Sequence, residues 1–136
     1  MDTIVVGYVD TPTGTAALEA AIEEAERRGA HISVITSNRG AGTDDAASLP
    51  DQEAALEAVV SDLTARGVDH EVHHLVRGKS PAEDLSEHAA ETGAVLIVIG
   101  YRRRTPTGKF LLGSDSRDVL LSSPCSVLCI RVDDEA

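Results

Sequence analysis

Short apolar runs alternate with segments of helical periodicity along the whole chain. Five runs predict β-strands, four of them mainly apolar and the third more polar, as at a sheet edge. They lie at residues 4–6, 32–35, 70–76, 95–99 and 127–132. Strands separated by helices pair in parallel through right-handed crossovers, so the pattern predicts a doubly wound sheet.

Four helices are expected between these strands. The first carries apolar residues at helical spacing around Leu18 and Ile22 and stops at Gly29. The second begins near 48–51 and stops at Gly67, after a polar loop at 37–49. The third begins at Ser80-Pro81-Ala82-Glu83, which has the residues of a capping box, and runs to about Gly93. The fourth is short, from Ser114 to about Ser122.

The unbroken apolar run at 95–99 is typical of a central parallel strand that is covered on both faces. The 136 residues suffice for one domain with a single core and not for two. We therefore expect one three-layer α/β domain over residues 1–136, with helices on both faces of an open sheet. In such sheets the ligand crevice lies at the carboxyl ends of the strands. This places together the segments that follow Val6, Ile35, Val76 and Ile99.

The net charge of −11 argues against general affinity for nucleic acid or for an anionic membrane. No run is long enough to span a membrane, and the N-terminus lacks the pattern of a signal peptide, so we expect a cytoplasmic protein. The basic residues are unevenly distributed. Four of the twelve Lys and Arg residues fall between Gly100 and Ser114, a stretch without acidic residues. A local basic segment in an acidic protein indicates a small anionic ligand.

Cysteine and histidine usage gives little sign of a metal or catalytic site. Cys125 and Cys129 lie four residues apart around the last expected strand. If both sit on one extended segment, their Cα atoms are about 13 Å apart, beyond disulfide reach. The five histidines are scattered, and His73 and His74 are adjacent on a strand, so they point to opposite faces. We therefore expect no metal site. No catalytic set is visible, and a weak ATPase, which needs only Mg²⁺ and a positioned water, is a less favoured possibility.

The segment from Gly100 to Ser114 has the chemistry of a phosphate-binding loop. Gly100 is expected to close the buried strand and to let the backbone turn sharply. Gly113-Ser114 opens a helix whose free N–H groups favour an anion. Each feature has a plainer interpretation, because Ser114 could be only a helix cap and three consecutive arginines a solvated surface. Their combination is what favours phosphate.

At these residues the chain resembles the ATP-binding branch of the universal stress protein family. The pattern of that branch is Gly, two residues, Gly, nine residues, Gly, then Ser or Thr. Gly100 and Gly113-Ser114 match it, whereas Arg103 replaces the second Gly. The resemblance also covers Asp10, the turn at 77–81 and the segment at 123–128. It implies a five-stranded, mainly parallel sheet of order 3-2-1-4-5 and a homodimer that pairs through the last strand, from Val127 to Val132.

The resemblance further implies a regulatory protein of the stress response that binds ATP, with or without Mg²⁺. Asp10 would hold the ribose or the adenine edge, and the adenine would be bordered by Val9, Thr36 and Ser37. The phosphates would be surrounded by Gly100, Arg102, Gly113, Ser114 and Ser116. We expect Arg103 to contribute by pairing with phosphate oxygens. The alternative is a dimeric interaction module of the same fold that does not bind nucleotide, and Arg103 is the residue that separates the two.

Overall fold

The computed structural model describes residues 1–8, 12–38, 49–76, 79–103 and 114–133. Five parallel strands form one sheet in the order β3-β2-β1-β4-β5, as the resemblance implied. The strands are β1 (Thr3–Gly7), β2 (His31–Asn38), β3 (His70–Val76), β4 (Leu96–Arg103) and β5 (Ser126–Asp133). The helices are α1 (Pro12–Arg28), α2 (Leu49–Ala65), α3 (Pro81–Thr92) and α4 (Ser114–Ser122).

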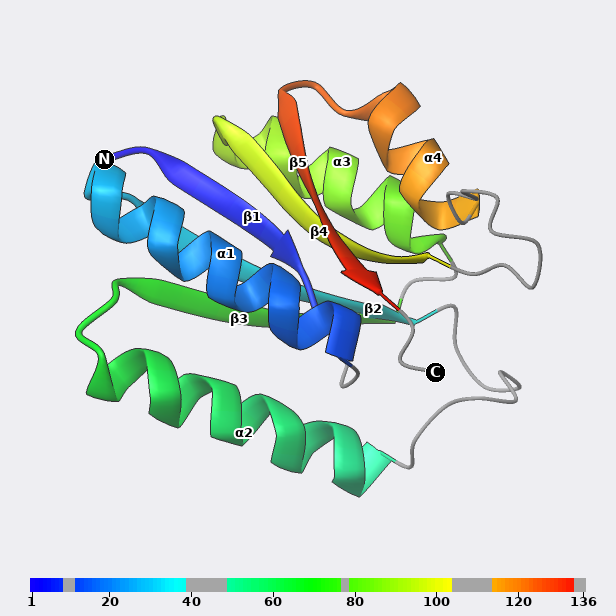
Figure 1. Cartoon of the computed structure of the whole chain (residues 1–136). Helices are drawn as coiled ribbons and strands as arrows, with labels where there is room; N and C mark the ends of the chain where they lie inside the picture. The colour runs from blue at the N-terminus through cyan, green and yellow to red at the C-terminus, as the bar shows by residue number, and fades with distance from the viewer. Residues whose placement is uncertain (9–11, 39–48, 77–78, 104–113, 134–136) are drawn as a thin grey trace.

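The sheet is covered on both faces, and each face has its own hydrophobic core (Figure 1). Residues of α1 and α2 pack on one face against Ile4, Val6, Ile32, Val34 and Val98. Residues of α3 and α4 pack on the other face against Val5, Ile35, Ile97 and Ile99. Neighbouring residues of β1 and β4 therefore point into different cores, which explains why both strands consist of unbroken apolar runs.

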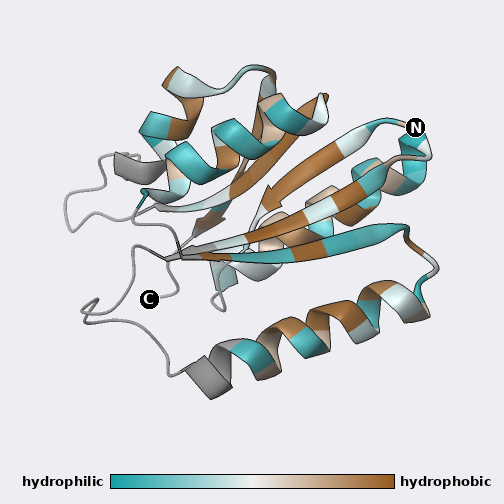
Figure 2. Ribbon diagram, turned by 180° about the vertical axis from the view of Figure 1, so that it is seen from behind, coloured by the Kyte–Doolittle hydropathy of each residue, from teal (hydrophilic) through white to brown (hydrophobic). Residues whose placement is uncertain are grey.

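Apolar residues are concentrated in the inner strands, whereas the edge strand β3 is largely polar (Figure 2). This agrees with the edge position expected for the third strand. The strands are longer than the apolar runs, because polar residues such as Ser37 and Asn38 still pair with the neighbouring strand. Ser37 had been expected in a loop, but its backbone is part of β2.

Helix α3 begins as its sequence predicts. The Glu83 N–H donates to Ser80 Oγ at 3.1 Å, and the Ser80 N–H donates to Glu83 Oε1 at 3.0 Å. This reciprocal capping box, with Pro81 in the first turn, satisfies backbone donors that the helix itself leaves unpaired. The helix ends at Gly93, whose φ of 65° suits a residue without a Cβ.

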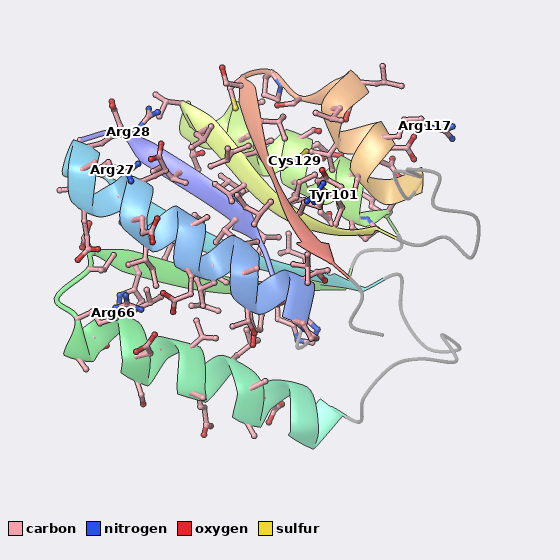
Figure 3. The ribbon with its side chains drawn as sticks, viewed as in Figure 1. Arg27, Arg28, Arg66, Tyr101, Arg117 and Cys129 are labelled. Carbon is pink, nitrogen blue, oxygen red and sulfur yellow. The ribbon has the colours of Figure 1, made fainter. Side chains whose placement is uncertain are left out.

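Both cysteines are free, as their expected spacing predicted. Cys129 lies on β5 and packs against the core beneath α3 and α4 (Figure 3). Burial raises the pKa of the Cys129 thiol, because a thiolate would lose its hydration there.

We therefore expect the Cys129 thiol to be poorly reactive in the folded protein. In a Cys125→Ser variant at pH 8, iodoacetamide should modify Cys129 several-fold more slowly than in the same variant unfolded in urea, because the thiolate is the nucleophile. The reaction can be followed by mass spectrometry. Equal rates in the folded and unfolded protein would contradict the burial of this side chain.

Candidate functional site at the carboxyl edge of the sheet

The connections from β1 and β4 leave the sheet toward opposite faces. The chain passes from β1 into α1, which covers one face, and from β4 into α4, which covers the other. β1 and β4 are neighbours in the sheet, so the order of the strands reverses between them. In open α/β sheets the ligand crevice lies at this point, outside the carboxyl ends of the strands. The candidate site is therefore the end of β1, the start of α1 and the end of β4.

The ends of β1 and β2 are joined by two hydrogen bonds beyond the last paired residue of β1. The Tyr8 N–H donates to the Ile35 carbonyl oxygen at 2.9 Å, and Thr36 Oγ1 donates to the Tyr8 carbonyl oxygen at 3.2 Å. Thr36 thus lies beside the backbone that leads toward Val9 and Asp10, which themselves lie outside the described residues. These two bonds extend the pairing of β1 with β2 to Tyr8.

Gly100 has a different role from the one expected. It does not turn the chain, because β4 continues through it to Arg103, and Gly100 pairs with Ile130 of β5. The close packing of α1 explains the need for glycine. A Cβ atom at residue 100 would lie 2.2 Å from the carbonyl oxygen of Thr13 and 2.9 Å from its carbonyl carbon. Gly100 therefore lets the first turn of α1 approach the strand at the crevice.

Arg102 and Arg103 are the last two residues of β4, paired in register with Val132 and Asp133. No described residue other than glycine has a positive φ. The backbone conformation at residue 103 is therefore open to any L-amino acid, so arginine can replace the glycine of the family pattern there without backbone strain.

Two predicted phosphate ligands lie at the start of α4. Ser114 is the first residue of the helix, as predicted, and Ser116 is half-buried in its first turn. Gly113 lies outside the described residues, as does the rest of the segment at 104–113. The described residues thus include both flanks of this connection, the end of β4 and the start of α4. The phosphate-binding role of the segment between them stays a prediction.

The start of α1 was not recognised as part of the site from the sequence. The apolar periodicity begins at Leu18, but the helix starts at Pro12, six residues earlier. Thr13 and the buried Gly14 therefore stand in the first turn, next to Gly100. Proline is favoured at the first position of a helix, so Pro12 was the signal that could have located this end.

Several basic side chains lie far from the crevice. Arg27 and Arg28 stand at the end of α1 and Arg66 beyond the end of α2, at the amino edge of the sheet (Figure 3). Each is paired with an acid: Arg27 with Glu24 at 2.7 Å, Arg28 with Glu24 at 3.3 Å, and Arg66 with Glu19 at 3.0 Å. Hydrogen bonding to Glu19 raises the pKa of Arg66. These cations are thus engaged elsewhere, and Arg102 and Arg103 are the basic residues of β4 at the carboxyl edge.

A shallow groove between α3 and α4 is a poor candidate for a phosphate site. Three acidic residues line it, together with serines and apolar side chains: Glu83, Glu87 and Asp118, with Ser80, Ala82, Ser86, Leu121 and Ser122. Carboxylates would repel the negative charge of a phosphate. No described helix is long and apolar enough to cross a membrane.

Comparison with known proteins agrees with this geometry. The model of the universal stress protein family matches residues 1–131. A universal stress protein of Mycolicibacterium smegmatis is 39% identical over 128 residues, which cover 94% of this chain and 96% of that protein. The chain belongs to the universal stress protein family.

Solved structures of the family support the same assignment. The structure of a universal stress protein from Archaeoglobus fulgidus matches with a TM-score of 0.81 at 38% identity, covering 96% of this chain and 98% of that one. A structure of the universal stress protein from the same organism in complex with dAMP matches with a TM-score of 0.74 at 32% identity, over 96% and 98% of the two chains. Nucleotide binding therefore occurs among the relatives of this chain.

Proposed function

We propose that this universal stress protein is a cytoplasmic, dimeric regulator that binds ATP at the carboxyl edge of its sheet, with or without Mg²⁺. The observation that carries the proposal is the approach of α1 to β4 at Gly100, where the strand order reverses. A Cβ at this position would meet the backbone of Thr13. The crevice thus has backbone rather than side chains on its floor, which suits a phosphate group that needs N–H donors.

The relatives and the charge distribution support an adenine nucleotide as the ligand. A related structure contains dAMP. In this chain the end of β4 and the segment after it hold Arg102, Arg103, Arg104 and Lys109, which supply positive charge for more than one phosphate. Asp10 would accept hydrogen bonds from the ribose, and the residues around Thr36 would border the adenine.

Calorimetric titration with ATP and MgCl₂ tests the proposal. We expect one nucleotide per chain and weaker binding in an Asp10→Ala variant, because the ribose hydroxyls would lose an acceptor. Gly113→Val should also weaken binding, by preventing close approach of the phosphates. Asp2→Ala is the matched control, because Asp2 is exposed at the amino edge of the sheet and loses the same charge.

No heat and no thermal shift with ATP or AMP would refute the proposal. In that case the second candidate, a dimeric interaction module that binds no nucleotide, would take its place, since Arg103 departs from the family pattern. Measurement of phosphate release in the same samples would show whether bound ATP is hydrolysed.

The homodimer is proposed to pair through β5. The described residues of β5 pair only with β4, so its other edge is open. Val127, Leu128 and Ile130 are only half-buried there. The opposite edge strand, β3, carries charged and histidine side chains, which protect an edge from pairing. An apolar open edge such as β5 is the one that a second copy would close.

Hydrogen exchange tests this interface. In a dimer paired through β5, all amides of the strand are hydrogen-bonded, so we expect uniformly slow exchange from Val127 to Val132. In the edge strand β3, amides that point away from β2 should exchange fast, which provides an internal control. A monomer by light scattering, or alternate fast amides in β5, would contradict the proposed dimer.

A further inference from the structure

The fold brings together three side chains of types that can ligate a metal, two from one strand and one from a helix. Glu71 and His73 lie two residues apart on β3, so they share one face of the sheet. His88 comes from α3, which packs over β1 and β2 on that face. One ligand atom from each of the three lies within 4.8 Å of those of the other two. The five histidines had appeared scattered in the sequence, but two of them meet here.

His73 and His88 approach each other directly. Their ring centroids are 5.0 Å apart and the ring planes are inclined by 55°. Ser33 is fully buried on β2, and its Oγ lies 2.7 Å from Nε2 of His88. This contact holds the His88 ring above the sheet. Polar contacts that fix the orientation of a histidine ring are the usual surroundings of a metal ligand.

His73 provides a second and independent observation. Its Nε2 atom is buried, and the described residues offer it no hydrogen-bond partner of good geometry. Glu71 Oε2 lies 3.2 Å away, close enough for an ion pair but outside the geometry of a hydrogen bond. A buried nitrogen without a hydrogen bond costs stability, because it has lost its contact with water and gained no partner. A cation between the nitrogen and the carboxylate would remove this cost.

The carboxylate of Glu71 is the oxygen donor of this cluster. It is also approached by His31 Nε2 at 3.4 Å and by Ser33 Oγ at 3.3 Å. A carboxylate and two imidazoles are thus the donors at this place.

We propose that Glu71, His73 and His88 bind a divalent transition-metal ion, Zn²⁺ in the first instance. Two imidazole nitrogens and one carboxylate oxygen suit Zn²⁺, whereas Ca²⁺ and Mg²⁺ prefer oxygen donors alone. Zn–N distances of about 2.0–2.1 Å place tetrahedral donors about 3.4 Å apart. The ligand atoms, which lie within 4.8 Å of one another, would therefore have to move closer by up to about 1.4 Å. The side chains of His73 and Glu71 are 37% and 43% exposed, which leaves room for a water as fourth ligand.

This site is separate from the nucleotide crevice. Glu71 and His73 pair in register with Ser33 and Ile35, before the end of β2, and His88 lies in the second half of α3. Bound metal would link α3 to the edge strand β3. Its first effect is therefore on stability, because a ligand that binds only the folded state stabilises it by mass action.

The test uses the full chain without an affinity tag, freed of metal with EDTA and free of nucleotide. We expect one Zn²⁺ per chain by calorimetry, a rise in melting temperature, and visible absorption typical of four-coordinate Co²⁺ when cobalt replaces zinc. Glu71→Gln, His73→Gln and His88→Gln should each weaken Zn²⁺ binding by at least about tenfold. Circular dichroism verifies that each variant is folded, and Asn variants at the same positions replace any that is not.

His70→Gln is the matched control, because His70 lies on the same strand but on the opposite face, with Nδ1 2.8 Å from the Val68 carbonyl oxygen. We expect its Zn²⁺ affinity to stay within about twofold of the parent chain. No saturable Zn²⁺ binding by calorimetry would overturn the proposal. Equal losses in His70→Gln and His73→Gln would overturn it too, since they would indicate nonspecific binding.

Discussion

A Gly100→Ala variant is expected to lose about 3 kcal/mol of its free energy of unfolding, at the upper end for overpacking substitutions. The added Cβ would lie 2.2 Å from the carbonyl oxygen of Thr13 and 3.2 Å from its Cα. These are backbone atoms of the first turn of α1, so no side-chain rotation can relieve the clash. Either α1 or β4 must shift. Urea unfolding monitored by circular dichroism measures the loss.

Gly67→Ala is the matched control for this prediction. Gly67 has a φ of 71°, and no described atom lies within 4 Å of a Cβ built there. The control therefore carries only the strain of a left-handed backbone, about 1 kcal/mol. An equal loss in both variants would mean that the contact between Gly100 and Thr13 is not tight. If α1 moves aside in the Gly100→Ala variant, that variant should also bind ATP more weakly, because α1 forms one wall of the proposed crevice.

The parts of the fold that follow from local signals were predictable. The strand at 70–76 and the helix from Ser114 to Ser122 have the bounds that their sequences predict. The capping box at Ser80 is formed as the residues Ser80 and Glu83 indicate. In each case the signal is contained in a few neighbouring residues, and the packing of the rest of the chain does not oppose it.

Gly100 shows where local signals fail. A glycine directly after an apolar run favours a turn, because glycine permits many backbone conformations. In the structure the strand β4 continues past this glycine to Arg103, because β5 offers pairing partners along its whole length. The requirement for glycine arises from α1, which approaches from almost ninety residues earlier in the chain. A single sequence carries no sign of such an approach.

The cluster of Glu71, His73 and His88 could not be predicted from the sequence for the same reason. Glu71 and His73 are neighbours on one strand, but His88 reaches them only because α3 crosses the same face of the sheet. The strand periodicity correctly separated His73 from His74. It could not place a helical residue above the sheet, because the position of α3 depends on how the two layers pack.

The second large effect is expected from Arg103, at the end of β4, on nucleotide binding. Arg103→Gly restores the glycine of the family pattern and removes a cation at the carboxyl edge. We expect ATP affinity to fall by about 10- to 100-fold, which corresponds to the loss of one or two hydrogen bonds to charged groups. AMP should lose less, because it offers fewer phosphate oxygens to the guanidinium. Calorimetric titration with both nucleotides measures the two losses.

The charge-matched control is Arg27→Ala, which also removes one positive charge but lies at the amino edge of the sheet, paired with Glu24. Its ATP affinity should stay within about twofold of the parent chain, because an exposed charge more than a Debye length away is screened. Residue 103 stands at the end of a strand without a positive φ, so glycine gains no needed backbone freedom there. Stronger ATP binding by Arg103→Gly would therefore show that the arginine obstructs the crevice, and the role proposed for its guanidinium would be wrong.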